Sequence, residues 1–184
     1  CYYRQDFGRL NADKDSYGVP RSKSIQTTPA HQLALAAVYY SPLQYMYWYD
    51  KPSDSQDEPE LKFFDDVYTT WDDTKVLQGE VGEFITIARR KGEEWFIGSI
   101  TNNEKRVLSV SLDFLPEGKN YIAEIYTDGD KSVKTRTKVR VSTYRVSNKT
   151  KLNFCLKASG GGAVRLVPDD GNIKSVKNYK QQRL

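Results

Sequence analysis

Four consecutive residues, Tyr47-Trp48-Tyr49-Asp50, combine aromatic rings with a carboxylate and are the best candidates for contact with a ligand. Aromatic faces can stack on sugar rings, and a carboxylate can accept hydrogen bonds from sugar hydroxyl groups. The segment ends an aromatic run that begins at Leu43 and is typical of a β-strand. We therefore take Tyr47, Trp48 and Asp50 as candidate substrate-binding residues. The alternative is that Tyr47 and Tyr49 only pack inside a protein core.

Other residues that could do chemistry have simpler structural explanations. His31 is the only histidine, and it lies in an apolar segment, so a hydrogen bond to a nearby loop is favoured over a role as general base. The pairs Asp65-Asp66 and Asp72-Asp73 could offer oxygen ligands to calcium, but their spacing is not that of a calcium loop, and a solvated linker explains them equally well. The sequence therefore assigns no catalytic residue and no metal ligand.

Composition excludes several classes of protein. The 28 Lys and Arg residues against 24 Asp and Glu give a net charge of only +4, too small an excess to predict nucleic-acid binding. No apolar run is long enough to span a membrane. Two cysteines, Cys1 and Cys155, do not predict a disulfide and lack the spacing of a metal site. Residues 169–184 form a basic tail.

The first part of the chain has the pattern of an α/β repeat. Thr28-Pro29 predicts a helix start, and the apolar run that follows to Tyr40 predicts a helix buried on most sides. A strand is expected at 43–49, and a short amphipathic helix at 60–67 with Leu61 and Phe64 facing inward and Phe63 as a further inward candidate. Helix, strand, loop and helix in this order predict a remnant of a (β/α)8 barrel within residues 1–74.

Residues 75–168 change to a period of two, which predicts an antiparallel β-sandwich. The fold class is therefore mainly β, with the helix-strand-helix barrel remnant before the sandwich. Gly160-Gly161-Gly162 lacks the context of a phosphate-binding loop and predicts a tight turn or bulge. Strands are expected at 84–89, 95–100, 106–114, 121–126, 135–141, 152–156 and 163–167.

Five short motifs in this order resemble glycoside hydrolase family 97. They extend from Thr27 to Leu166 and so cover most of the chain. The segment 45–54 is more similar to the α-galactosidase-like members. The motifs are Thr27-Thr28 with His31-Gln32-Leu33-Ala34-Leu35, Tyr40-Ser41-Pro42-Leu43-Gln44, Thr69-Thr70-Trp71-Asp72-Asp73-Thr74, Ile87-Ala88-Arg89-Arg90-Lys91-Gly92 with Trp95-Phe96-Ile97-Gly98, and Gly160-Gly161-Gly162-Ala163-Val164-Arg165-Leu166.

The resemblance implies a parent protein with an N-terminal β-sandwich, a catalytic (β/α)8 barrel and a C-terminal β-sandwich associated with oligomerisation. Residues 28–40 would be the seventh barrel helix, 43–49 the eighth strand, 60–67 the eighth helix and 75–167 the C-terminal sandwich. Such enzymes hydrolyse α-glucosidic or α-galactosidic bonds of oligosaccharides, use calcium, and are often exported to a periplasm.

Catalysis would require groups from outside this chain. Glycosidases use two positioned carboxyl groups, and in the family these groups and the calcium ligands precede the segment represented here. We therefore expect a C-terminal fragment that is structural, that forms homo-oligomers through its sandwich, and that has no activity or calcium site of its own. The competing hypothesis is a stand-alone carbohydrate-binding or interaction module, which would leave the apolar helix at 33–40 unexplained.

Overall fold

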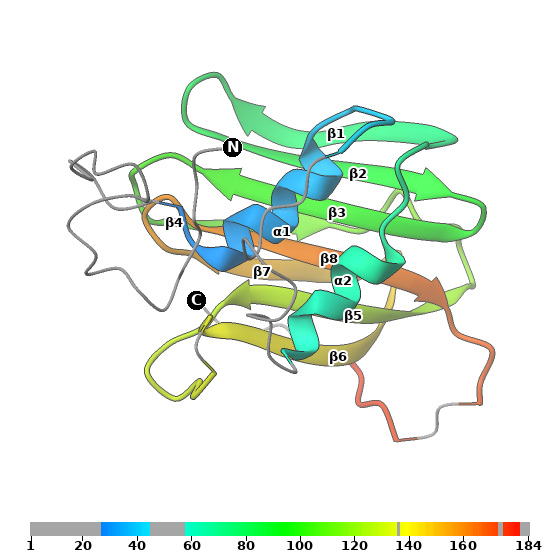
Figure 1. The fold of residues 1–184 in the computed structure, drawn as a ribbon. Coiled ribbons are helices and arrows are strands. Elements are labelled where there is room, and N and C mark those ends of the chain that lie inside the picture. The colour runs from blue at the N-terminus through cyan, green and yellow to red at the C-terminus, as the bar shows by residue number, and fades with distance from the viewer. Residues whose placement is uncertain (1–26, 45–57, 136, 173–174, 181–184) are drawn as a thin grey trace, which may run out of the picture.

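The computed structural model describes residues 27–44, 58–135, 137–172 and 175–180 (Figure 1). This part of the chain is mainly β, as predicted. Its helical elements are α1 (Pro29–Val38), a 3-10 turn η2 (Pro59–Leu61) and α2 (Lys62–Asp66). Its strands are β1 (Asp73–Glu80), β2 (Phe84–Lys91), β3 (Glu94–Thr101), β4 (Arg106–Ser111), β5 (Asn120–Asp128), β6 (Val139–Ser147), β7 (Lys151–Leu156) and β8 (Gly161–Pro168).

The strands form two antiparallel sheets. The larger sheet has six strands in the order β1-β2-β3-β8-β5-β6, and the smaller sheet pairs β4 with β7. Alternate residues of the strands fill the space between the sheets, including Trp95, Ile97, Leu108 and Phe154. Because successive side chains of a strand point to opposite faces, the larger sheet has a second face that also needs cover.

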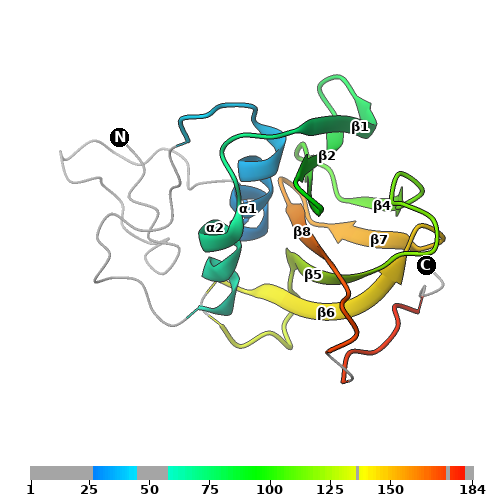
Figure 2. The ribbon, with the colours of Figure 1, turned by 90° about the vertical axis from the view of Figure 1, so that its right-hand side faces the viewer.

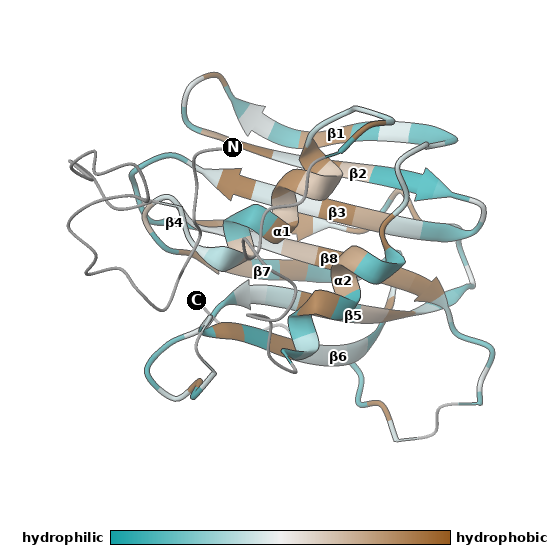
Figure 3. Ribbon diagram, viewed as in Figure 1, coloured by the Kyte–Doolittle hydropathy of each residue, from teal (hydrophilic) through white to brown (hydrophobic). Residues whose placement is uncertain are grey.

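Helices α1 and α2 cover that second face. Seen from the side, they lie on one side of the six-stranded sheet, and β4 and β7 lie on the other (Figure 2). Hydrophobic residues of the central strands lie beneath α1 (Figure 3). A second apolar cluster joins the helices to the sheet, with Leu33, Phe63, Phe96 and Tyr126 among its members. The described molecule therefore has three layers and two apolar cores.

The two predicted helices are confirmed in position. The side chain of Thr28 caps α1 by accepting a hydrogen bond from the N–H of His31. Most of the residues of α1 are buried, as its apolar circumference predicts. In the second helix all three expected residues face the sheet, although Phe63 is the fully buried one and Leu61 and Phe64 pack against the cluster only partly buried.

Three strands differ from the predictions. The strand predicted at 106–114 ends at Ser111. The strand predicted at 135–141 begins at Val139 and continues to Ser147, because Lys138 adopts a left-handed φ of 55°, which turns the chain there. Strand β1 was not predicted, since a bulge between Val76 and Gln78 interrupts its alternation. The strand predicted at 43–49 lies largely outside the described residues.

One edge of the larger sheet, at β6, is covered by the C-terminal tail, whereas no described segment covers the other edge, at β1. At β6, the N–H of Arg145 donates to the carbonyl of Lys177, and the N–H of Tyr179 donates to the carbonyl of Arg145. The ring of Tyr179 also packs edge-on against Tyr144. This part of the basic tail thus continues the sheet at β6. No described segment pairs with the outer side of β1.

Candidate functional site

On one face of the larger sheet, α1 docks unusually close to the strands. Two glycines let the backbone of α1 approach the strands closely. A Cβ on Gly98 of β3 would lie 2.5 Å from the carbonyl oxygen of Ala34, and a Cβ on Gly161 of β8 would lie 2.5 Å from the Cα of His31. Real Cβ atoms do not make contacts this short. Glycine is therefore required at both positions for α1 to dock at this depth.

His31 holds the start of α1 to the turn before β8. Its Nδ1 lies 3.1 Å from the carbonyl oxygen of Gly160, and the N–H of Thr28 donates to the carbonyl of Ser159. Burial lowers the pKa of His31 below its usual value of 6.5, so the neutral imidazole is favoured at neutral pH. These contacts confirm the predicted structural histidine bonded to a nearby loop. The glycine run does not form the predicted tight turn, because the turn lies at Ala158 and Ser159, and Gly161 and Gly162 are already part of β8.

Arg89 of β2 holds the other end of α1. Its Nε donates to the carbonyl of Ala37 at 2.5 Å and one terminal nitrogen donates to the carbonyl of Val38 at 2.9 Å. The other terminal nitrogen donates to the hydroxyl of Thr74 at 2.8 Å, and the ring of Tyr40 lies 5.2 Å from the guanidinium carbon. Burial lowers the pKa of Arg89. Its charge meets the partial negative charge of a helix C-terminus rather than a carboxylate.

Contacts between aromatic rings attach α2 to the larger sheet. The ring of Phe63 packs edge-on against Phe96 of β3 at 5.9 Å and against Tyr126 of β5 at 5.3 Å between centroids. Such edge-to-face pairs contribute roughly 0.5–1.5 kcal/mol each beyond the burial of their area. Burial also raises the pKa of Tyr126. The short helix is therefore held by one deeply inserted side chain, since five residues are too few to form a stable helix alone.

Arg165 of β8 adds a polar contact to this attachment. It donates to Glu94 at 2.9 Å and to Asp66 of α2 at 2.7 Å, and Glu124 lies 3.6 Å away. Lys62 of α2 pairs with both Asp66 and Glu124. Hydrogen bonds and charges from these carboxylates, beginning with Glu94, raise the pKa of Arg165 against the effect of burial. Three clustered carboxylates are thus paired with two cations, which leaves a net charge of one negative unit and links α2 to the sheet.

Glu60 is a buried carboxyl group in the 3-10 turn before α2. The Thr137 hydroxyl donates to its Oε1, while its Oε2 has no hydrogen-bond partner among the described residues. Burial raises the pKa of Glu60 above its usual value of 4.5, and the nearby Glu58 adds to this increase. The folded state therefore holds a proton here more tightly than the unfolded chain does.

Replacing Glu60 by Gln should change how stability depends on pH. Since the folded-state pKa is raised, the carboxyl group favours folding at low pH, and this contribution declines as pH rises from about 4.5 through the folded-state pKa. Glu60→Gln cannot ionise, so its stability relative to the native chain should increase from pH 4.5 to pH 7.5. Urea denaturation at both pH values measures the difference. The exposed Glu117→Gln serves as control, and equal behaviour of the two variants would contradict the expectation.

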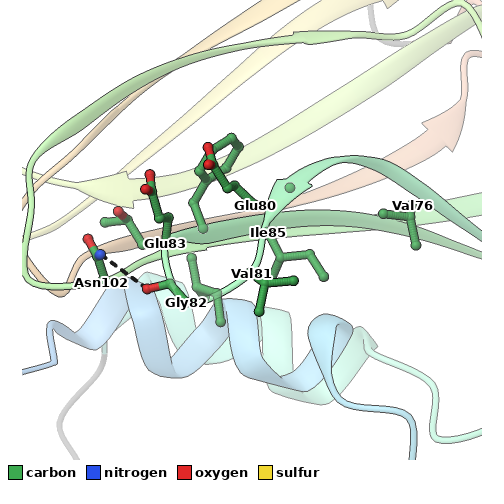
Figure 4. A pocket seen from close by; sticks show the side chains of 11 residues that line it. Val76, Glu80, Val81, Gly82, Glu83, Ile85 and Asn102 are labelled. Carbon is green, nitrogen blue, oxygen red and sulfur yellow. Dashed lines mark hydrogen bonds between the residues drawn. The ribbon is translucent and has the colours of Figure 1, made fainter.

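An apolar pocket lies at the β1–β2 hairpin on the same side of the sheet as α1. It has a volume of about 560 Å³, and its apolar lining includes Val76, Val81, Ile85 and Ile100. In Figure 4, Val81 and Ile85 lie on the side of the hairpin that faces α1, and the carboxylates of Glu80 and Glu83 lie on the other side. Val81 at the hairpin tip is fully exposed. This lining favours contact with an apolar protein surface.

The structure tests only some of the candidate residues predicted from the sequence. Tyr47, Trp48 and Asp50 lie outside the described residues. The acidic pairs do not converge, because Asp66 binds Arg165 whereas Asp72 accepts a hydrogen bond from the N–H of Gly92 at 2.7 Å. Within residues 27–44, 58–135, 137–172 and 175–180 no group of three His, Cys, Asp or Glu side chains could hold a metal ion.

Sequence reasoning missed the residues that attach the helices. Arg89 and Arg165 have the pattern of solvent-exposed charges on a strand, and Gly98 interrupts an apolar strand with no turn beside it. A glycine within a strand is a signal of close backbone approach, so Gly98 could have been found in this way. None of the helices in the described ranges is long and apolar enough to cross a membrane.

Comparison with known proteins places these features in a family. Residues 70–167 match the family model described as glycosyl-hydrolase 97 C-terminal, oligomerisation. A retaining α-galactosidase of Bacteroides thetaiotaomicron is 34% identical over 158 residues, which are 85% of this chain and 23% of that protein. A family 97 enzyme of Pseudoalteromonas sp. strain K8, solved with acarbose, is 37% identical with a TM-score of 0.71, over 79% of this chain and 23% of the enzyme.

A more distant structure shares the fold alone. A β-arabinopyranosidase is 24% identical with a TM-score of 0.61, over 80% of this chain and 22% of that enzyme. The alignments to the closer relatives are longer than the 98 residues of the family model, so they include residues outside the sandwich.

The fold and its helix-bearing face define a β-sandwich domain that binds helical segments against one side of its larger sheet. The chain belongs to glycoside hydrolase family 97, in which it corresponds to the C-terminal part and contains the domain described as an oligomerisation domain. It spans about a quarter of the length of the relatives that it matches.

Proposed function

We propose that this chain is the C-terminal structural and oligomerisation part of a family 97 glycoside hydrolase. Its sandwich would hold the last helices of a catalytic barrel and provide a contact to a second copy. The observation that carries this proposal is the docking of α1 on Gly98 and Gly161 with its C-terminal carbonyls bound by Arg89. A stand-alone module would have no need of helices bound this closely.

On this proposal, α1 and the helix at 60–67 are the seventh and eighth helices of the barrel, and residues 1–74 are its C-terminal remnant. Residues 75–168 are the sandwich and 169–184 the basic tail. The helix-bearing face supports this division, because helices surround such barrels and must be covered on their outer sides where another domain is attached. The domain boundary would lie at the start of β1.

The whole protein would hydrolyse α-glucosidic or α-galactosidic bonds of oligosaccharides, with calcium at its active site. The relatives support this substrate class, since they are described as a retaining α-galactosidase and as a family 97 enzyme that binds acarbose. Tyr47, Trp48 and Asp50 would contact substrate in the whole protein. They lie at the end of an expected barrel strand, and barrel active sites lie at that end of the strands.

Hydrolysis assays test whether this chain contributes structure or chemistry. The purified chain should not release nitrophenol from nitrophenyl α-glucoside or α-galactoside, with or without calcium, because two positioned carboxyl groups are needed. A whole relative such as the α-galactosidase provides the positive control. Turnover by this chain that is lost in Asp50→Asn would refute the proposal.

A binding measurement separates the structural role from a carbohydrate-binding module. Calorimetric titration of the chain with maltose and with melibiose should give no heat of binding. The described apolar pocket supports this expectation, because its lining lacks the tryptophan and tyrosine faces on which sugar rings stack. Tight binding of either sugar would favour the module instead.

A further inference from the structure

Among the described residues, the outer edge of β1 is open to a partner. β6, at the other edge, is bridged by backbone hydrogen bonds to residues 177–179, whereas no described segment covers β1. Five residues of β1 are exposed: Thr74, Lys75, Val76, Gly79 and Glu80. An unpaired strand edge offers hydrogen-bonding groups and side chains to another chain. The bulge between Val76 and Gln78 breaks the regular pairing, so side chains must supply much of any contact.

Exposed apolar side chains gather at this edge. Val76 is 67% exposed, Val81 at the hairpin tip is fully exposed, and both line the pocket of about 560 Å³. The other large apolar residues exposed within the sandwich, Val107 and Val141, lie on β4 and β6 and do not line it. The strand edge and the hairpin tip thus carry exposed apolar side chains beside an apolar pocket, and we refer to residues 74–81 as the β1 edge.

The charges on the β1 edge of one copy are complementary to those on the β1 edge of a second copy. Lys75 and Glu80 point to the same face of the sheet, since their cross-strand partners on β2, Ala88 and Phe84, are four residues apart. Glu80 has no ion-pair partner within the described ranges, and Lys75 contacts only the neighbouring Asp73, at 3.4 Å, and the ring of Trp95. Two copies related by a two-fold axis between Leu77 and Gln78 would therefore place each Lys75 opposite the partner's Glu80.

The same two-fold arrangement places a larger side chain of one copy opposite a glycine of the other. It sets Val76 opposite the partner's Gly79, and both positions lie on the face that carries α1, because they pair with Ile87 and Ile85 of β2. An isologous contact of this kind uses the same surface patch on both copies and closes at a dimer.

We propose that the β1 edge binds a second copy of this chain in an antiparallel, two-fold arrangement, with Lys75 paired to the partner's Glu80 and Val76 and Val81 buried at the contact. This inference rests on the proposed oligomerisation role and assigns the surface that performs it. Pairing two β1 edges also joins the six-stranded sheets of the copies edge to edge and removes the open edge that each copy otherwise exposes.

Sedimentation velocity of the full chain over a wide range of concentration tests the contact. The native chain should dimerise. Val81→Asp and Lys75→Glu should each weaken the dimer about tenfold or more, because each places a charge against apolar surface or against a like charge. The double variant Lys75→Glu/Glu80→Lys should restore dimerisation by reversing both charges. Val107→Asp on β4 should leave it unchanged, and denaturation curves check that every variant is folded.

The possible results separate this inference from the proposed function. A native chain that stays monomeric at every concentration would refute the oligomerisation role itself. A native dimer that persists in Val81→Asp and Lys75→Glu would overturn the β1 edge as its surface while leaving oligomerisation intact. A double variant that fails to recover would overturn the two-fold pairing of Lys75 with Glu80.

Discussion

Gly98→Val is expected to release α1 from the sheet and to lower the free energy of unfolding by about 2–3 kcal/mol, the upper range for overpacked sites. A Cβ at this position would lie 2.5 Å from the carbonyl oxygen of Ala34 and 2.9 Å from a methyl group of Val38. The backbone of α1 cannot rotate away as a side chain can. Relief therefore requires the whole helix to lift from β3. Urea denaturation gives the stability, and hydrogen exchange of the α1 amides reports the release.

The control for this variant is a valine on an exposed strand position. Ser109→Val on β4 introduces the same side chain at an exposed position, so its stability should change by no more than about 0.5 kcal/mol. Gly161→Val, which would meet the backbone of His31, should resemble Gly98→Val. If Gly98→Val is as stable as the native chain and protects the amides of α1 equally well, close docking is not required.

Arg89→Met should destabilise the chain by about 3 kcal/mol, because it leaves the buried carbonyls of Ala37 and Val38 without a donor, at roughly 1–3 kcal/mol for each. Methionine keeps much of the volume, so the loss reports hydrogen bonds rather than a cavity. Arg89→Lys should recover only part of the stability, since one ammonium group cannot reproduce the planar set of donors. Thermal and urea denaturation of the three proteins measure the order of stability.

The neighbouring arginine is the matched control for Arg89. Arg90 points to the opposite face of β2 and donates to the carbonyl of Gly92 in an exposed turn. Arg90→Met should therefore alter stability by no more than about 0.5 kcal/mol. If the two methionine variants are equally stable, the contact of Arg89 with α1 contributes little to the fold.

The two helix-attachment predictions and the dimer prediction concern different parts of the larger sheet. Gly98 and Arg89 hold α1 on the strands β2 and β3, whereas the β1 edge lies beyond the helix. Variants at the β1 edge should therefore change self-association without changing the stability of the single chain. This separation allows oligomerisation to be studied in a folded monomer.

Local patterns predicted those elements whose residues carry their own signals. Thr28-Pro29 and the apolar run after it define α1 by a cap and by helix composition, and the alternation of β2, β3 and β7 defines those strands. The motifs in order also identified the family, as residues 70–167 and the relatives show. The candidate residues Tyr47, Trp48 and Asp50 stay a prediction, because they lie outside the described residues.

Only the tertiary structure decided which surfaces these elements share. Arg89 and Ala37 are in contact although they are 52 positions apart in the sequence. Gly161 and His31 are in contact although the whole sandwich lies between them in the sequence, so no periodicity relates either pair. The same limit applies to β1, whose bulge breaks the alternation by which a strand is recognised. It applies also to the outer edge of β1, which the order of the described strands leaves without a neighbour. Composition and spacing report local preference, whereas docking, burial of charge and sheet edges depend on contacts between distant segments.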